Sequence, residues 1–137
     1  MLKNKPFDLF TLQWHITNNC QLRCKHCYVD FTKPLNFSLE NFQLALENYT
    51  RFLQYFQIQG KIYFTGGDPL LHPKFWDIVS ETRKKEITVS LFWNYHLLHD
   101  RNIEKLIDND INFYQLSLEW LKETHNHIRW SWTFEGV

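Results

Sequence analysis

Three cysteines lie within eight consecutive positions near the start of the sequence, at Cys20, Cys24 and Cys27. Three residues separate the first pair and two separate the second, so one short loop presents three sulfur ligands. Thiolates are the usual ligands of iron–sulfur clusters, and a full set is four. Three cysteines would leave one iron of a four-iron cluster without a protein ligand. The triad therefore predicts a cluster with an open iron, where a substrate or cofactor could bind.

Two other uses of these cysteines stay open. A zinc site of three cysteines and one histidine could use His26 or a distant histidine, which would make the protein a small binding module without redox chemistry. The thiols could also be buried as small apolar side chains. Zinc sites usually pair CxxC units at two separate places, and no second pair occurs in this sequence. We therefore favour the cluster.

A second group of residues suited to ligand binding is the turn Gly66-Gly67-Asp68-Pro69. Two glycines directly after a strand allow a backbone to approach a ligand more closely than side-chain-bearing residues would. A plain connection between a strand and a helix would also use such a turn. The turn supports a binding site only if the fold brings it near the cysteines.

Alternating strands and helices are predicted to position these groups. Runs of β-branched and aromatic residues predict strands, and apolar residues three and four positions apart predict helices. The predicted strands are 8–17, 61–65, 87–93 and 111–118, the predicted helices are 39–58, 73–86 and 101–109, and a further helix is expected to begin in 131–137. Ser38 and Asp100 are placed to cap helices, and Gly60 follows the end of the first.

This order predicts an α/β fold class with a parallel sheet, built from about four right-handed βα units. In such sheets the chemistry gathers at the C-terminal ends of the strands. The cysteines, the GGDP turn, Asn94, and Ser117 with Glu119 each follow or end a predicted strand, so we expect one shared site. Four strands cannot close a barrel, so we expect the chain to stop partway through a fold.

Length and composition indicate one unit over residues 1–137, because 137 residues with 44% hydrophobic content suffice for one core. Fifteen basic and fifteen acidic residues balance, so we expect no nucleic-acid partner. The sequence shows no secretory signal and no apolar stretch of about 18 residues, which predicts a cytoplasmic protein without a membrane partner.

The segment WHITNNCQLRCKHCYVD, residues 14–30, resembles the signature of radical S-adenosyl-L-methionine (SAM) enzymes. The resemblance implies that the α/β fold is a partial (βα) barrel, in which the cysteine loop follows the first strand. The resemblance implies that Cys20, Cys24 and Cys27 hold a four-iron four-sulfur (4Fe-4S) cluster. It also implies that the amino and carboxylate groups of SAM chelate the unique iron, and that electron transfer cleaves SAM to methionine and a 5'-deoxyadenosyl radical. His26 occupies a place near the adenine in that family, and Tyr28 follows it.

Two later segments extend the resemblance. GGDP is similar to the family's GGEP motif, which implies that Gly66, Gly67 and Asp68 engage the amino group of SAM, with aspartate in place of glutamate. Residues 115–119 and 125–129 resemble the SLD…HDxIRG stretch of peptide-modifying members with SPASM or twitch domains. This likeness implies that Ser117 touches SAM and that Arg129 pairs with its carboxylate, for which a guanidinium fork is well shaped.

The expected function is therefore that of a radical SAM enzyme, which cleaves SAM reductively to start radical chemistry on a peptide or protein. A flavodoxin or ferredoxin is the expected reductant. The core domain is expected to be incomplete at its C-terminal end. The alternative is a truncated or split subunit without independent activity, whose missing strands a partner chain would supply.

Overall fold

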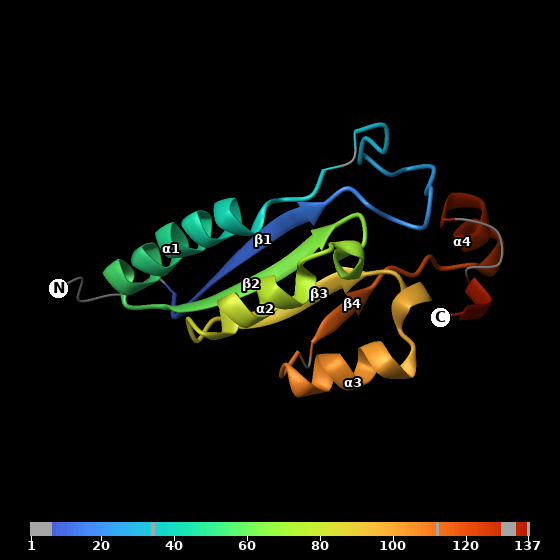
Figure 1. The fold of residues 1–137 in the computed structure, drawn as a ribbon. Helices are drawn as coiled ribbons and strands as arrows, with labels where there is room; N and C mark the ends of the chain where they lie inside the picture. The colour runs from blue at the N-terminus through green and yellow to red at the C-terminus, as the bar shows by residue number, and fades with distance from the viewer. Residues whose placement is uncertain (1–6, 34, 112, 130–133, 137) are drawn as a thin grey trace.

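A computed structural model describes residues 7–33, 35–111, 113–129 and 134–136 of the chain. Its strands form one parallel sheet in the order β1-β2-β3-β4, and helices alternate with them (Figure 1). The strands are β1 (Leu9–Thr17), β2 (Gln59–Gly66), β3 (Thr88–Trp93) and β4 (Tyr114–Leu116). The helices are α1 (Leu39–Phe56), α2 (Phe75–Arg83), α3 (Asp100–Asp108) and α4 (Lys122–Arg129), with 3-10 turns η1 (Pro69–Leu71), η2 (Tyr95–Leu97) and η3 (Phe134–Gly136). The predicted α/β class and parallel sheet are confirmed.

The hydrophobic core lies between the sheet and the helices α1, α2 and α3, whose buried side chains form one cluster with those of the strands. Alternation along β2 sends Ile62 and Phe64 into this core, and both are fully buried. Leu46 of α1 and Ile78 of α2 pack into the same cluster. Burying each such side chain contributes about 1.5–3 kcal/mol. Packing in this core holds the strands side by side, and the site lies at their C-terminal ends.

The ends of α1 and α3 differ in part from the prediction. Ser38 caps α1 as expected, its Oγ accepting from the Asn41 amide at 3.2 Å. The expected role of Gly60 after this helix is wrong: α1 ends before Gln57, which takes the left-handed conformation with a φ of 53°. Gly60 lies inside β2, where a Cβ would overlap the Leu53 side chain. Likewise α3 includes Asp100, and its N-cap is His99.

The C-terminal part of the chain departs most from the prediction. β4 covers only three residues of the predicted 111–118 strand. Ile111 is buried, but its amide binds the Leu106 carbonyl at 2.9 Å and so closes α3 instead of extending the sheet. The helix α4 is not among the predicted elements. Of the helix expected in 131–137, residues 131–133 and 137 lie outside the described residues, and η3 accounts for the rest.

The cysteine loop and α4 lie together at the C-terminal ends of the strands, opposite the N-terminal end of β1 (Figure 1). The amide of Lys25 in the loop binds the carbonyl of Ile128 in α4 at 2.7 Å, which joins these distant segments. None of the described helices is long and apolar enough to cross a membrane.

Candidate functional site

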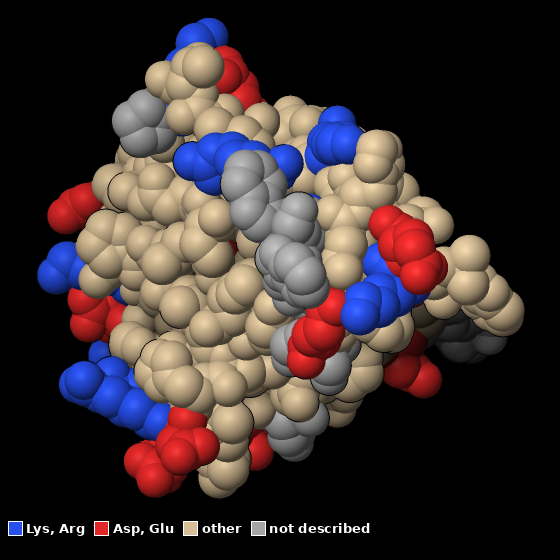
Figure 2. All heavy atoms as spheres, turned by 90° about the vertical axis from the view of Figure 1, so that its right-hand side faces the viewer, with Lys and Arg blue, Asp and Glu red and all other residues tan. Residues whose placement is uncertain are grey.

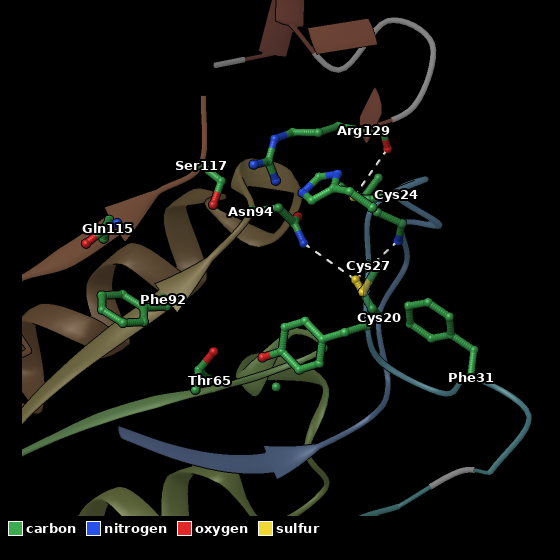
Figure 3. A pocket seen from close by; sticks show the side chains of 15 residues that line it. Cys20, Cys24, Cys27, Phe31, Thr65, Phe92, Asn94, Gln115, Ser117 and Arg129 are labelled. Carbon is green, nitrogen blue, oxygen red and sulfur yellow. Dashed lines mark hydrogen bonds between the residues drawn. The ribbon is translucent and has the colours of Figure 1, made fainter. Parts of the chain in front are cut away.

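A pocket of about 270 Å³ opens at the C-terminal end of the sheet (Figure 3). Its volume is just below the range of about 300–1,000 Å³ that is usual for small-molecule sites. The cysteine loop forms one side, and the ends of β2, β3 and β4 form the other. The lining residues are Cys20, Leu22, Cys24, His26, Cys27, Tyr28, Phe31, Thr65, Gly66, Gly67, Phe92, Asn94, Gln115, Ser117 and Arg129. The pocket thus brings together the cysteines, both glycines of the GGDP turn, Asn94 and Ser117.

The three cysteines are free thiols and partly exposed to this pocket. The Sγ of Cys20 accepts from the Leu22 amide at 3.4 Å, and the Cys24 thiol donates to the Arg129 carbonyl at 3.5 Å. Burial is the main cause that raises the pKa of the Cys20 thiol to about 11; the hydrogen bond from the Leu22 amide opposes the shift, and the nearby Asp68, Cys24 and Cys27 contribute to it. Burial also raises the pKa of Cys24. Both thiols are therefore protonated at neutral pH, and metal ligation would have to displace their protons.

The donor set fits a cluster in number and type. Among the described residues, no group of three His, Cys, Asp or Glu side chains is arranged to hold a single metal ion. A four-iron cluster asks for a different arrangement, with one thiolate at each of three corners. Cys20, Cys24 and Cys27 would offer that set from one loop beside the pocket.

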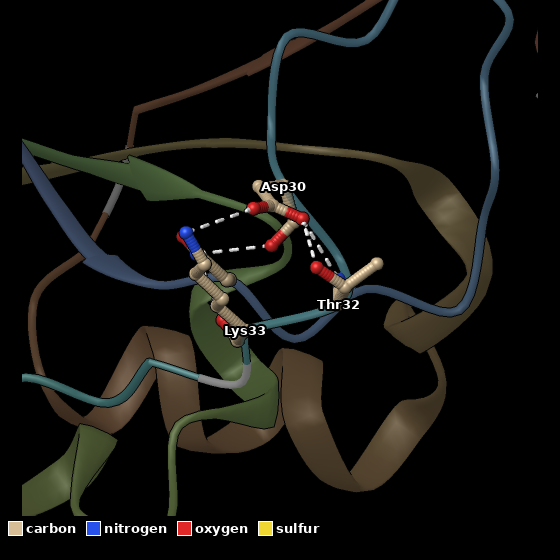
Figure 4. Close-up of polar contacts among 4 residues, drawn as sticks. Asp30, Thr32 and Lys33 are labelled. Carbon is tan, nitrogen blue, oxygen red and sulfur yellow. Dashed lines mark hydrogen bonds and ion pairs between the residues drawn. The ribbon is translucent and has the colours of Figure 1, made fainter.

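Local hydrogen bonds close the cysteine loop at its far end (Figure 4). The Asp30 carboxylate accepts from the Thr32 amide at 3.0 Å and from the Thr32 hydroxyl at 2.6 Å, which lowers the pKa of Asp30. Lys33 forms an exposed ion pair with the same carboxylate at 3.8 Å. The Asn18 side chain donates to the carbonyls of Asp30 and Lys33. The end of the loop is thereby tied to its beginning.

The GGDP turn packs against the first residues of the loop. The Gly67 amide donates to the Thr17 carbonyl at 2.8 Å, and the Asp68 amide donates to the Asn19 carbonyl at 2.7 Å. Gly66 has a φ of 125°, and a Cβ on it would overlap the Thr17 carbonyl oxygen. A Cβ on Gly67 would overlap the carbonyl oxygen of Asn19. Both glycines therefore allow backbone to meet backbone here, whatever ligand they also face.

Asp68 does not line the pocket, unlike the other residues that the family resemblance assigned to the cluster or to SAM. Its side chain is fully buried and accepts from Gln21 Nε2 at 3.1 Å, Asn94 Nδ2 at 3.2 Å and the Leu70 amide at 3.0 Å. Burial raises its pKa to about 6, although these hydrogen bonds oppose the shift. The carboxylate lies behind the pocket wall, where it links three segments.

Ser117 and Arg129 both line the pocket. The Arg129 guanidinium is paired with Glu119: Nε and Nη2 lie 2.9 and 2.7 Å from the same carboxylate oxygen. Their side chains are 17% and 28% exposed, so the pair is partly shielded from water. The glutamate that replaces the motif's aspartate is long enough to make this contact. Arg129 is therefore held in place beside the pocket before any ligand binds.

His26 and Tyr28 lie on the exposed side of the pocket. The Tyr28 side chain is 75% exposed, and its hydroxyl is 3.1 Å from Nε2 of His15 on β1. Both rings are thus available to a planar ligand, although neither is enclosed.

Several pocket residues were not identified from the sequence. Thr65, Phe92 and Gln115 lie on one face at the ends of three strands, and strand alternation could have indicated them. Gln21 and Phe31 carried no signal, because their roles depend on contacts with residues far along the chain or on loop shape. Arg23 was also missed: it donates to the carbonyls of Cys20 at 2.6 Å and Leu22 at 2.8 Å.

Charges on the surface around this end of the molecule are mixed. Figure 2 shows basic and acidic side chains interspersed on the face that carries the site, with uncharged residues over much of it. The chain has no net charge. No field of a single sign therefore surrounds the pocket.

Comparison with known proteins places this geometry in a family. The profile of the Radical SAM superfamily matches residues 14–137. The tungsten-containing aldehyde ferredoxin oxidoreductase cofactor-modifying protein of Pyrococcus furiosus is 28% identical over 131 residues, which cover 92% of this chain and 35% of that protein. The PqqA peptide cyclase of Gluconobacter oxydans is 25% identical over 120 residues, or 86% of this chain and 32% of that protein. The chain thus spans about a third of the length of these relatives.

Solved structures share the fold. The structure of tagged anSMEcpe with bound AdoMet aligns with a TM-score of 0.69 and 23% identity, covering 92% of this chain and 38% of that one. Streptococcus suis SuiB bound to precursor peptide SuiA aligns with a TM-score of 0.61 and 18% identity, covering 88% and 27%. At these identities the likeness shows the fold alone. Since the family profile also spans most of the sequence and includes the cysteine triad, the chain belongs to the radical SAM superfamily.

Proposed function

We propose that this chain binds a 4Fe-4S cluster through Cys20, Cys24 and Cys27 and uses it to cleave SAM reductively. One observation carries the proposal: a single pocket is lined by all three free cysteines and by the C-terminal ends of three parallel strands. Membership of the superfamily supports the same chemistry. When bound and reduced, the cluster supplies one electron to the sulfonium of SAM, whose carbon–sulfur bond breaks to give methionine and a 5'-deoxyadenosyl radical.

The residues of this chain would bind and orient SAM. Backbone groups of Gly66 and Gly67 face the pocket and suit the amino group. Arg129 carries a guanidinium suited to the carboxylate, and Ser117 offers a hydroxyl beside it. His26, together with the neighbouring Tyr28, would flank the adenine.

We further propose a peptide or protein substrate. Support comes from similar proteins named as a peptide cyclase and as a complex with a precursor peptide. Another similar protein, however, is named Fe-coproporphyrin III synthase, so the substrate class needs its own test. A flavodoxin or ferredoxin would supply the electron in the cytoplasm. The sheet of the described residues has four strands, and we propose that a partner chain completes the barrel.

The decisive experiment is anaerobic reconstitution with iron and sulfide, followed by visible absorption and low-temperature EPR after reduction. The wild type should be brown and give a reduced-cluster signal that changes when SAM is added. The triple variant Cys20→Ala, Cys24→Ala, Cys27→Ala should lose both colour and signal. The matched variant His26→Ala should keep them, because a four-iron cluster needs only the three cysteines, whereas a zinc site built on His26 would lose its metal.

Two results would count against the proposal. A colourless protein with stoichiometric zinc would support the zinc module. A protein without any bound metal would leave the cysteines as scaffold. Formation of 5'-deoxyadenosine, measured by chromatography, then separates an active enzyme from a subunit that binds a cluster but needs a partner chain.

A further inference from the structure

Three hydrogen bonds join the GGDP turn to the chain around the first cysteine. They involve every second residue from the end of β1 onward, namely Thr17, Asn19 and Gln21. Thr17 and Asn19 accept from the amides of Gly67 and Asp68 at 2.8 and 2.7 Å. The third link uses side chains: Gln21 Nε2 donates to Asp68 Oδ2 at 3.1 Å. Cys20 therefore lies between two residues that are hydrogen-bonded to the turn, and the carboxylate of Asp68 accepts the last of the three bonds.

Asn94, which follows β3, joins the same network. Its Nδ2 donates to Asp68 Oδ2 at 3.2 Å and lies 3.9 Å from the Sγ of Cys20. Its Oδ1 accepts from Gln21 Nε2 at 3.2 Å. Asp68, Gln21 and Asn94 thus hold one another around Cys20, although they come from three segments of the chain.

The Asp68 carboxylate has no exposed surface, and both of its oxygens accept hydrogen bonds from the protein. Oδ1 accepts from the Leu70 amide, and Oδ2 accepts from the two side-chain amides. To reach a ligand in the pocket, the carboxylate would have to leave these donors. Hydrogen bonds to a charged group are among the stronger ones in proteins, so such a movement is unfavourable.

We propose that Asp68 is a positioning residue, which holds the Cys20 segment in place through Gln21 and Asn94 and does not bind the amino group of SAM. The amino group is left to the backbone of Gly66 and Gly67. This inference refines the proposed function, and only the second of its two experiments depends on that function.

The first experiment measures hydrogen–deuterium exchange of the metal-free protein. Removing the carboxylate in Asp68→Ala should make residues 18–23 exchange about tenfold faster, because hydrogen bonds that oppose local opening are lost. Gln21→Ala should give the same local effect. Combining the two changes should give less than the sum of the single effects, because both remove the hydrogen bond between Gln21 and Asp68. The exposed Gln54→Ala on α1 is the matched control and should leave residues 18–23 unchanged.

Gln21 is exposed, so its variant should fold even if Asp68→Ala does not. Unchanged exchange of residues 18–23 in Gln21→Ala would overturn the inference by itself. Additive effects of the two substitutions would also overturn it.

The second experiment uses the reconstituted protein and compares the binding of SAM with that of an analogue that lacks the α-amino group. A positioning role predicts that Asp68→Ala lowers the affinity for both ligands by the same factor. A direct contact with the amino group predicts that only the affinity for SAM falls, and this result would overturn the inference. Failure of the wild type to bind SAM would count against the proposed function, while the exchange result would still decide the role of Asp68.

Discussion

Two acidic side chains near the pocket differ in reach by one methylene group, and each stands where the family motif has the other. Asp68 is short and buried, and its carboxylate binds only groups of the protein. Glu119 is longer and reaches the guanidinium of Arg129 at 2.7 Å. A change of side-chain length thus determines whether the acid braces a loop or orients a neighbouring cation.

His72 shows how a single buried ring couples the fold to pH. Its Nε2 lies 2.9 Å from the Phe37 carbonyl, and its Nδ1 accepts from the Lys74 amide at 3.0 Å. A protonated ring cannot accept, so the fold needs the neutral form. Burial lowers the pKa of His72 below its ordinary value of 6.5.

We predict that this histidine makes stability fall as the solution becomes acidic. Below about pH 6.5 the unfolded chain binds a proton at His72 before the folded chain does, so stability is lost as the pH falls through the folded pKa. In His72→Asn, whose side-chain oxygen can still accept from the Lys74 amide, this part of the pH dependence should disappear. Urea unfolding at about pH 7 and about pH 5 measures the difference. Equal pH dependence in both proteins would contradict the prediction.

At the level of residues, type and spacing identified the cysteines and glycines that line the pocket, but did not identify the side chains that support them. The cysteines and the two glycines were predicted, because few other residue types provide thiolates or permit such close approach. Gln21 was missed, because it contacts partners 47 and 73 positions away that only the fold brings near. Side-chain supports of this kind carry no local pattern.

The helix α1 ends without the glycine that usually takes the left-handed conformation at a helix C-terminus. Gln57 takes the left-handed conformation usually left to glycine, and its amide binds the Gln54 carbonyl at 3.1 Å. Gly60 was expected to be near this end, but close packing by Leu53 explains it instead. The amide of Ile58 returns to the Leu53 carbonyl and completes the cap. Backbone hydrogen bonds therefore compensate for an unfavourable φ.

Two glycine substitutions near this cap should change the free energy of unfolding in opposite directions. Gln57→Gly should raise the free energy of unfolding by about 0.5–1 kcal/mol, because the left-handed conformation costs glycine nothing. Gln54→Gly, three residues earlier in the helix, should lower it by about 1 kcal/mol. Chemical denaturation of both variants beside the wild type checks the pair. Destabilisation by Gln57→Gly would contradict the prediction.

Element prediction failed where periodicity is weak. Apolar spacing identified α1, α2 and α3, whereas α4 has the polar sequence KETHNHIR and was missed. The chain leaves β4 after three residues, because its pairing with β3 ends at Leu116. The parallel direction of the strands was nevertheless predicted, because it depends on the alternation of whole segments.

Over the whole molecule, one core serves both the sheet and the site. Ile62 is fully buried in β2, between the strands that end at the cysteine loop and at Asn94. The register of β2 with both neighbours is continuous around it. Sheet and pocket should therefore lose their structure together.

Ile62→Val should lower the free energy of unfolding by about 0.5–1.5 kcal/mol through the loss of one buried methylene. Far-UV circular dichroism and tryptophan fluorescence should report the same midpoint in both proteins, as expected for a single cooperative unit. Separate midpoints would show that parts of the chain unfold independently.

The contacts between the cysteine loop and α4 have a consequence for the timing of biosynthesis. Cys24 and Arg129 are 105 positions apart. Since ribosomes add about 5–20 residues per second, roughly 5–20 seconds separate the synthesis of the thiols from that of the helix that partly covers them. During that interval the nascent cysteines are open to iron delivery and to oxidation alike. Cells that delay the ribosome between these codons would lengthen the period in which both can occur.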